Sequence, residues 1–168
     1  EAVRDVYGPA RAFVETSPTD GRKSYVVGET VLFQVRVGID AEVLEREALP
    51  LFGARVDLPL RVLAPWWSGF GGFEPVRFAV EPTRADDAAS ATLVVDGDAV
   101  AARKVEDRAV ENRRYSVFTF ERPFRATSPG RHAASTTTLS WSYATRFRDG
   151  VFGGRIPTDR RDAFAYGD

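Results

Sequence analysis

The sequence predicts an all-β fold, an antiparallel sandwich with long loops and one short helix. Three observations predict it. Val31, Phe33, Val35 and Val37 alternate with polar residues, which is the period of a half-buried strand. Asp96-Gly97 stands between β-forming residues, the strongest short-range hairpin signal. Two β-rich runs flank a Pro/Gly corner within residues 114–143, which favours an immunoglobulin-like sandwich.

The first third of the chain predicts two strands joined by turns. Residues 12–15 form a short first strand, and residues 17–21 form a turn because Pro18 presets φ and Gly21 supplies positive φ. Gly28 marks a bend before the strand that begins at Val31. Residues 41–48 carry a charge run that predicts a loop with a short helix.

The middle of the chain predicts an edge strand and a hairpin. Residues 55–63 alternate apolar and polar, but Pro59 lacks an N–H and places this strand at an edge or a bulge. Residues 78–80 form a short strand and residues 83–90 a solvent loop. Residues 92–100 form the hairpin, and residues 99–112 continue as an extended, exposed strand rather than a helix.

The last third predicts the two strands around the corner. The first begins at Tyr115 and is broken by Pro123, and Ser128-Pro129-Gly130 makes the corner. Residues 131–143 form the second strand, with Leu139, Trp141 and Tyr143 on one face. A final strand is expected at residues 163–166.

Length and composition restrict the possible functions. A chain of 168 residues is one domain, 1–168, and its start at Glu1 without a Met predicts a piece of a longer, exported protein. The net charge of −1 argues against a nucleic-acid footprint. Without Cys, and with His132 as the single His, no thiolate or multi-His metal site can form. The sequence contains no run of about 18 apolar residues, the length that would span a bilayer as a helix.

The stretch from Trp66 to Phe73 is the candidate partner-binding site. Successive side chains of a strand face opposite ways, so one of the two adjacent Trp residues would be exposed, and an exposed aromatic is a plausible contact anchor. The alternative is that the loop folds over the end of the sandwich and both rings pack there. The candidate binding residues are Trp66, Trp67, Phe70 and Phe73.

Other patterns do not support chemistry, and we expect no catalytic residue, no metal and no cofactor. Ser68-Gly-Phe-Gly-Gly lacks the helix start of a phosphate loop, and Asp96 with Asp98 fits a turn better than a calcium loop. No nucleophile elbow accompanies His132, and the acidic pairs lie in polar runs typical of charged loops. These pairs are Asp86-Asp87 and Glu106-Asp107.

Three segments together resemble one family. Residues 25–37 (YVVGETVLFQVRV) look like its opening strand, and Tyr115 to Phe124 followed by Ser128-Pro129-Gly130 resembles its later strand and corner, although Pro123 and Gly130 lie further apart than in that pattern. Pro65-Trp66-Trp67 and Phe152-Gly153 are similar to segments of longer members. The family is BatD, the bacterial oxygen-tolerance proteins.

This resemblance implies an N-terminal module from a tandem of immunoglobulin-like domains, exported and anchored by a C-terminal helix. Such proteins are encoded with MoxR-type ATPases and von Willebrand factor A domain proteins, are associated with aerotolerance or envelope stress, and have no established enzymatic activity. The expected function is non-enzymatic, extracytoplasmic protein binding in a bacterial envelope assembly, through an exposed strand edge or the Trp66–Phe73 loop. The alternative is a carbohydrate-binding accessory module. An enzyme with unfamiliar acids is the weakest hypothesis.

Overall fold

The fold is built from short and long β-strands with two single-turn helices. The computed structural model describes residues 11–76, 90–110, 112–151 and 153–167. The elements are β1 (Ala12–Pro18), β2 (Thr30–Asp40), the π-helical turn η1 (Val43–Glu47), β3 (Arg61–Leu63), the 3₁₀ turn η2 (Pro65–Ser68), β4 (Phe73–Pro75), β5 (Ser90–Val95), β6 (Asp98–Val110), β7 (Arg113–Ala126), β8 (Thr137–Tyr143), β9 (Phe147–Asp149), β10 (Arg155–Pro157) and β11 (Arg161–Gly167).

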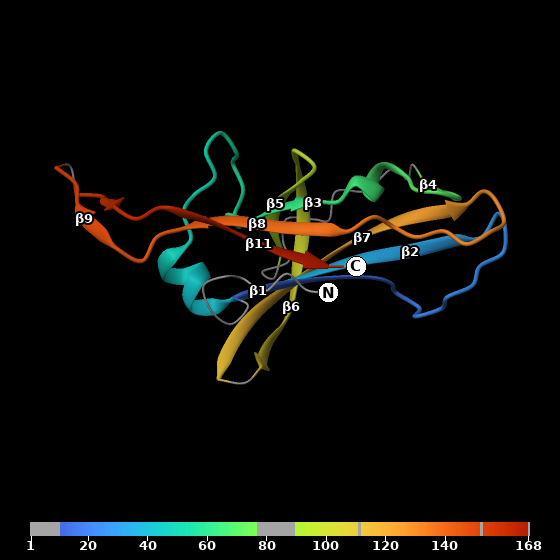
Figure 1. The fold of residues 1–168 in the computed structure, drawn as a ribbon, viewed down its shortest axis with the longest axis horizontal. Coiled ribbons are helices and arrows are strands. Elements are labelled where there is room, and N and C mark those ends of the chain that lie inside the picture. The colour runs from blue at the N-terminus through green and yellow to red at the C-terminus, as the bar shows by residue number, and fades with distance from the viewer. Residues whose placement is uncertain (1–10, 77–89, 111, 152, 168) are drawn as a thin grey trace.

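One large mixed sheet makes up most of the molecule (Figure 1). Its strand order is β1-β2-β7-β6-β5-β3-β8-β11, with β4 also paired to β7, and β3–β5 is its parallel pair. The sheet nearly closes into a barrel, because its two end strands, β1 and β11, lie close together. Their backbones approach so closely that a Cβ added to Gly167 of β11 would lie 2.1 Å from the Val14 carbonyl oxygen of β1. The all-β class is therefore confirmed, whereas the immunoglobulin-like sandwich stays a prediction.

The β2–β7 pair supplies the centre of the core. Val31, Val35 and Val37 of β2 lie opposite Phe124, Phe120 and Phe118 of β7, and these six side chains are all buried. Directly paired residues of an antiparallel ladder point to the same face, so the valines and phenylalanines form one apolar surface inside the barrel. This surface packs on Leu60, Leu93, Leu139 and Trp141 in the same cluster.

The outer face of β7 is buried as well. Val117 points outward, opposite Gly38 of β2, yet it is fully buried. Phe13 lies opposite Gly38 on β1, and a Cβ at Gly38 would come within 2.1 Å of its ring. Gly38 therefore leaves the space in which Phe13 lies over the sheet, where its ring is 5.7 Å from that of Tyr115.

Strand β6 extends beyond its neighbour β5. Its pairing with β5 ends where Arg103 meets Ser90, and from there to Val110 the described residues pair it with β7 alone. The register shifts between Lys104 and Glu106, which makes a β-bulge at this point.

Most predicted elements are confirmed. The first and last strands form as β1 and β11, the alternating strand forms as β2, and the charge run 41–48 contains the short helix η1. Asp96 and Gly97 both have positive φ, 49° and 99°, and join β5 to the extended, exposed β6. Residues 78–80 and 83–89 lie outside the described residues.

Two predictions about proline were wrong. Only residues 61–63 of the expected strand 55–63 are extended as β3, which pairs on both sides and is not an edge; Pro59 precedes it. Pro123 does not break its strand, because β7 continues to Ala126. The Pro123 carbonyl accepts a hydrogen bond from the Val76 amide, just past the end of the β4 ladder. In an antiparallel strand the N–H and C=O of one residue face the same side, so the N–H that Pro123 lacks would point toward the β4 side and not toward β2.

The second strand of the corner is shorter than predicted. β8 begins at Thr137, and residues 131–136 belong to the preceding loop. Leu139 and Trp141 are buried and Tyr143 is half-buried, so the predicted inner face holds. Within the described ranges, no helix is long and apolar enough to cross a membrane.

Trp141→Ala should lower the free energy of unfolding by about 3–5 kcal/mol, because a ring that is only 4% exposed would leave a cavity. Chemical denaturation would measure the loss. Phe164→Ala on the adjacent strand β11 is the control, since that ring is 52% exposed and its loss should stay within about 0.5 kcal/mol. Equal effects of the two changes would contradict the assignment of the inner face.

Candidate functional site

The predicted binding residues form an aromatic layer at one end of the barrel. Phe33 lies at its centre, with its ring centroid 5.9 Å from Trp66 and 5.5 Å from Phe70. Trp66 is 1% exposed, and its indole N–H donates to the Thr137 hydroxyl at 2.8 Å. Trp66 therefore belongs to the core and offers a partner almost no surface.

The other three predicted residues are half-buried. Phe70 and Phe73 stack on each other with centroids 5.0 Å apart. Trp67 lies on Phe120 at 5.3 Å, while the Arg122 guanidinium covers its ring at 5.4 Å. The structure thus brings all four predicted residues together, and their own contacts occupy much of their surface.

Successive side chains do not alternate here, because Trp66 and Trp67 lie in the 3₁₀ turn η2 rather than in a strand. The turn is held from outside by the hairpin, whose Asp96 carboxylate accepts from the Ala64 amide at 2.8 Å. His132 packs edge-on to Phe73 at 6.1 Å, and its Nε2 lies 3.2 Å from the Ser128 carbonyl. The Ser140 hydroxyl donates to the Arg61 carbonyl and not to His132, so these two residues do not form a Ser–His pair.

A second loop covers this end and is rigidified by charge. Arg22 donates to both Asp20 and Glu29, and the Tyr25 hydroxyl donates to Asp20 at 2.7 Å. The Tyr25 bond, then the Arg22 bond, lowers the pKa of Asp20 to about 2, while burial raises the pKa of Tyr25 to about 12. This network holds a tip on which Val26 is 74% exposed.

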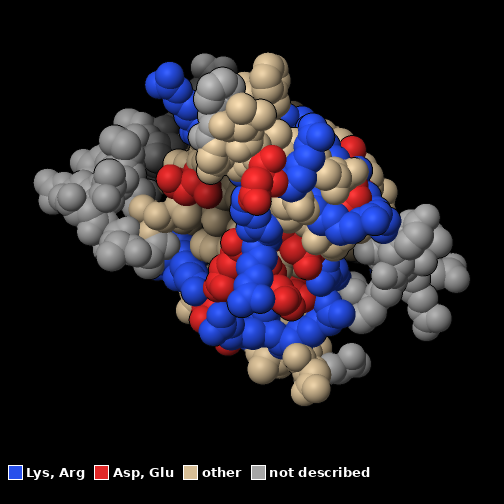
Figure 2. Space-filling view, turned by 90° about the vertical axis from the view of Figure 1, so that its left-hand side faces the viewer, with Lys and Arg blue, Asp and Glu red and all other residues tan. Residues whose placement is uncertain are grey.

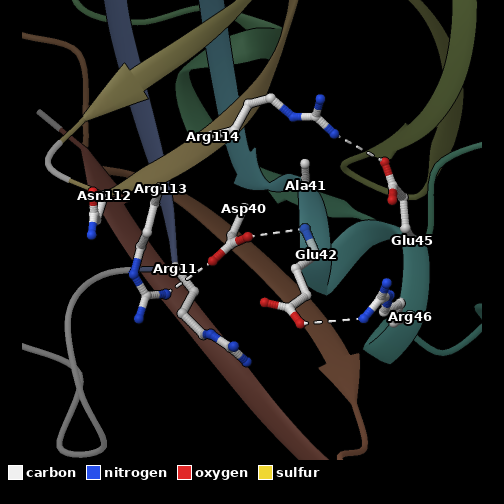
Figure 3. Close-up of a pocket in the computed structure, with 9 residues that line it drawn as sticks. All are labelled: Arg11, Asp40, Ala41, Glu42, Glu45, Arg46, Asn112, Arg113 and Arg114. Atoms are coloured by element: carbon white, nitrogen blue, oxygen red, sulfur yellow. Dashed lines mark hydrogen bonds and ion pairs between the residues drawn. The ribbon is translucent and has the colours of Figure 1, made fainter.

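The opposite end of the barrel carries a cleft of about 510 Å³ (Figure 3). Three segments that are distant in sequence meet there: Arg11 just before β1, residues 40–46 at the end of β2 and in η1, and residues 112–114 at the start of β7. Figure 2 shows Lys and Arg interleaved with Asp and Glu on this end. The lining residues are Arg11, Asp40, Ala41, Glu42, Glu45, Arg46, Asn112, Arg113 and Arg114.

Four ion pairs order the side chains around the cleft. Arg113 donates to Asp40 at 2.9 Å, and the Asp40 carboxylate also accepts from the Glu42 amide at 2.9 Å. Asp40 is the buried anchor, since its side chain is 8% exposed while that of Arg113 is 30% exposed. The other pairs are Arg11–Glu47, Arg46–Glu42 and Arg114–Glu45.

The two outer pairs leave their charges in water. Arg114 and Glu45 have side chains 62% and 63% exposed, and Arg46 and Glu42 are 74% and 62% exposed. Exposed pairs of this kind contribute little to stability, so their charges are available to exchange partners. The cleft can therefore bind charged groups of both signs. Across the described part of the chain, no group of three or more His, Cys, Asp or Glu residues is placed to hold a metal ion.

Sequence reasoning missed the cleft. The charge run 42–47 and the Arg113-Arg114 pair are visible in the sequence, but Arg113 and Asp40 are 73 residues apart. Only the pairing of β2 with β7, which places Asp40 opposite Tyr115, brings them together.

A two-stranded arm, β9–β10, lies beside the cleft end and forms a separate sheet. Its base is fixed by Asp159, which accepts from the Thr145 hydroxyl at 2.6 Å and from the Arg146 amide at 2.9 Å. The Thr145 bond, followed by the Arg146 amide, lowers the pKa of Asp159 from 3.8 to about 2.

The chain matches no protein-family model, no curated protein and no solved structure.

Arg113→Gln should lower the free energy of unfolding by about 2–3 kcal/mol, because it leaves the buried Asp40 carboxylate without its cation. The neighbouring Arg114→Gln is the matched control and should cost less than about 1 kcal/mol, since its pair is exposed. Denaturant titration would measure both. A larger loss for Arg114 than for Arg113 would contradict this order of burial.

The base of the arm should loosen in acid. A carboxylate whose pKa is lowered on folding stabilises the fold above its ordinary pKa and loses that contribution as pH falls from about 4 toward about 2. The Thr145 and Arg146 amide chemical shifts should therefore titrate with a midpoint near pH 2. Asp159→Asn should remove this step, and a midpoint near pH 4 in the wild type would show that these bonds do not form.

Proposed function

We propose that this domain is a non-enzymatic protein-binding module of a bacterial envelope assembly, an immunoglobulin-like unit of an extracytoplasmic protein. The single observation that carries the proposal is the cleft, where charged side chains from three distant segments converge. The resemblance to the oxygen-tolerance family supports the location and the type of partner. It suggests an envelope protein with a von Willebrand factor A domain.

The cleft has the chemistry of a docking site more than that of a reacting site. Arginine is enriched at protein interfaces, and its guanidinium binds carboxylates through two parallel hydrogen bonds. Arg46 and Arg114 present two such groups at the rim, beside the carboxylates of Glu42 and Glu45. A partner segment with an alternating charge pattern would exchange with these exposed pairs at little cost, because they contribute little to the fold.

The buried pair Arg113–Asp40 gives the docking surface a fixed floor. It ties the start of β7 to the end of β2, and the Asp40 bond to the Glu42 amide sets the first residues of the turn η1. Complementary charge on a pre-ordered surface mainly raises the association rate and the specificity. Recognition here would therefore be salt-sensitive.

The aromatic layer supports the carbohydrate alternative less well. Sugar stacking requires an open ring face, and both Trp residues of this layer have neighbours against them. We therefore assign the principal contact to the cleft and regard Trp67 as a secondary contact at most.

The test is a titration of this domain with a von Willebrand factor A domain protein, the partner class that the resemblance implies. Arg46→Glu with Arg114→Glu should weaken binding at least tenfold, chiefly through slower association, because two rim cations become anions. Calorimetry and surface plasmon resonance would measure affinity and rates. The change should leave the melting temperature almost unchanged.

The matched control reverses two exposed arginines at the loop end, Arg125→Glu with Arg131→Glu. This variant should bind like the wild type. Binding that survives reversal at the cleft, or that falls equally in both variants, would overturn the assignment of the cleft.

A further inference from the structure

The β9–β10 arm projects away from the barrel on its own. Figure 1 places β9 at the far end of the molecule from the loop that precedes β2 and the loop that follows β7. The arm forms its own two-stranded sheet, with Phe147 opposite Pro157 and Asp149 opposite Arg155. Isolated two-stranded ribbons are marginally stable in water, so a ribbon that is held in place needs support at its base.

That support is present. Asp159 fixes Thr145 and Arg146, and the Thr158 amide donates to the Arg146 carbonyl at 3.0 Å. Along the ribbon, the Arg155 guanidinium lies 3.9 Å from the centre of the Phe147 ring. This contact orders Arg155 without neutralising its charge.

The arm is basic although the chain as a whole is not. Residues 146–157 contain three arginines and one acid, Asp149, while the chain carries a net charge of −1. Arg148 and Arg155 are exposed, and no ion pair is found for either within the described ranges. Arg146 is paired with Asp159 at 3.6 Å and Asp149 lies opposite Arg155, so the arm presents a small excess of positive charge, carried by Arg148 and Arg155.

The tip of the arm is apolar. Val151 is 95% exposed at the turn between β9 and β10, and Ile156 is 40% exposed on the ribbon. An apolar tip beside two exposed arginines is suited to a surface whose outer layer is anionic and whose interior is apolar. A soluble polyanion would bind the arginines but would leave the apolar tip exposed to water.

We propose that the arm binds an anionic phospholipid surface, with Arg148 and Arg155 on lipid phosphates and Val151 at the boundary between headgroups and acyl chains. Guanidinium groups bind phosphate through paired hydrogen bonds, and partial burial of apolar side chains adds to electrostatic attraction at such interfaces. This contact uses none of the residues that line the cleft, so it does not depend on the proposed docking function.

The absence of Cys from the chain allows a specific probe. Val151→Cys labelled with a polarity-sensitive dye should show a blue-shifted emission with vesicles of phosphatidylcholine and phosphatidylglycerol. It should show little shift with phosphatidylcholine alone. Val26→Cys, which is 74% exposed at the other end, is the matched control and should not respond.

Charge variants test the role of the arginines. Arg148→Gln should lower the vesicle partition coefficient about fivefold, and Arg148→Gln with Arg155→Gln about thirtyfold, given the usual contribution per arginine near an anionic surface. Arg125→Gln with Arg131→Gln is the control and should partition like the wild type. Retained Thr145 and Arg146 amide shifts would verify that the base of the arm stays folded.

Several outcomes would overturn the proposal. The first is an equal dye response at positions 151 and 26. The second is a vesicle partition coefficient that stays the same without the anionic lipid or after substitution of Arg148 and Arg155. The third is a full dye shift with soluble polyphosphate and no vesicles, which would assign the arm to polyanions in general.

Discussion

The register between β2 and β7 is the constraint on which the rest of the molecule depends. It runs from Thr30 opposite Arg125 to Asp40 opposite Tyr115, and it fixes both ends of the barrel at once. At one end it places Phe33 at the centre of the aromatic layer, and at the other it places Asp40 beside Arg113. A slip of one residue would turn the valines of β2 outward and would separate the buried ion pair.

The same pair explains why β7 is buried on both faces. Its inner phenylalanines lie in the barrel, and its outer Val117 lies beside the gap that Gly38 leaves for Phe13. A simple alternation of buried and exposed residues therefore fails for this strand. The covering of the outer face comes from β1, which is distant in sequence from β7 and joins the sheet through β2.

Sequence reasoning succeeded where the signal was local. The alternation from Val31 to Val37 and the Asp96-Gly97 turn each specify their own conformation within a few residues, and both are present. The argument about Trp66 and Trp67 assumed a strand, and the 3₁₀ turn points the two rings in directions that alternation does not describe. The cleft could not be predicted from the sequence, because its residues are polar, form no recognisable motif and are brought together only by long-range strand pairing.

The bulge in β6 has a consequence for behaviour at high concentration. A long strand with a bare side is normally a template on which another copy can polymerise edge to edge. Here the stretch after Arg103 is kinked near Val105 and carries Lys104, Glu106, Asp107 and Arg108, so an incoming strand would meet charge and a broken hydrogen-bonding pattern. The bulge and these charges thus oppose edge-to-edge growth of this ribbon into fibrils when many copies of the domain are close together.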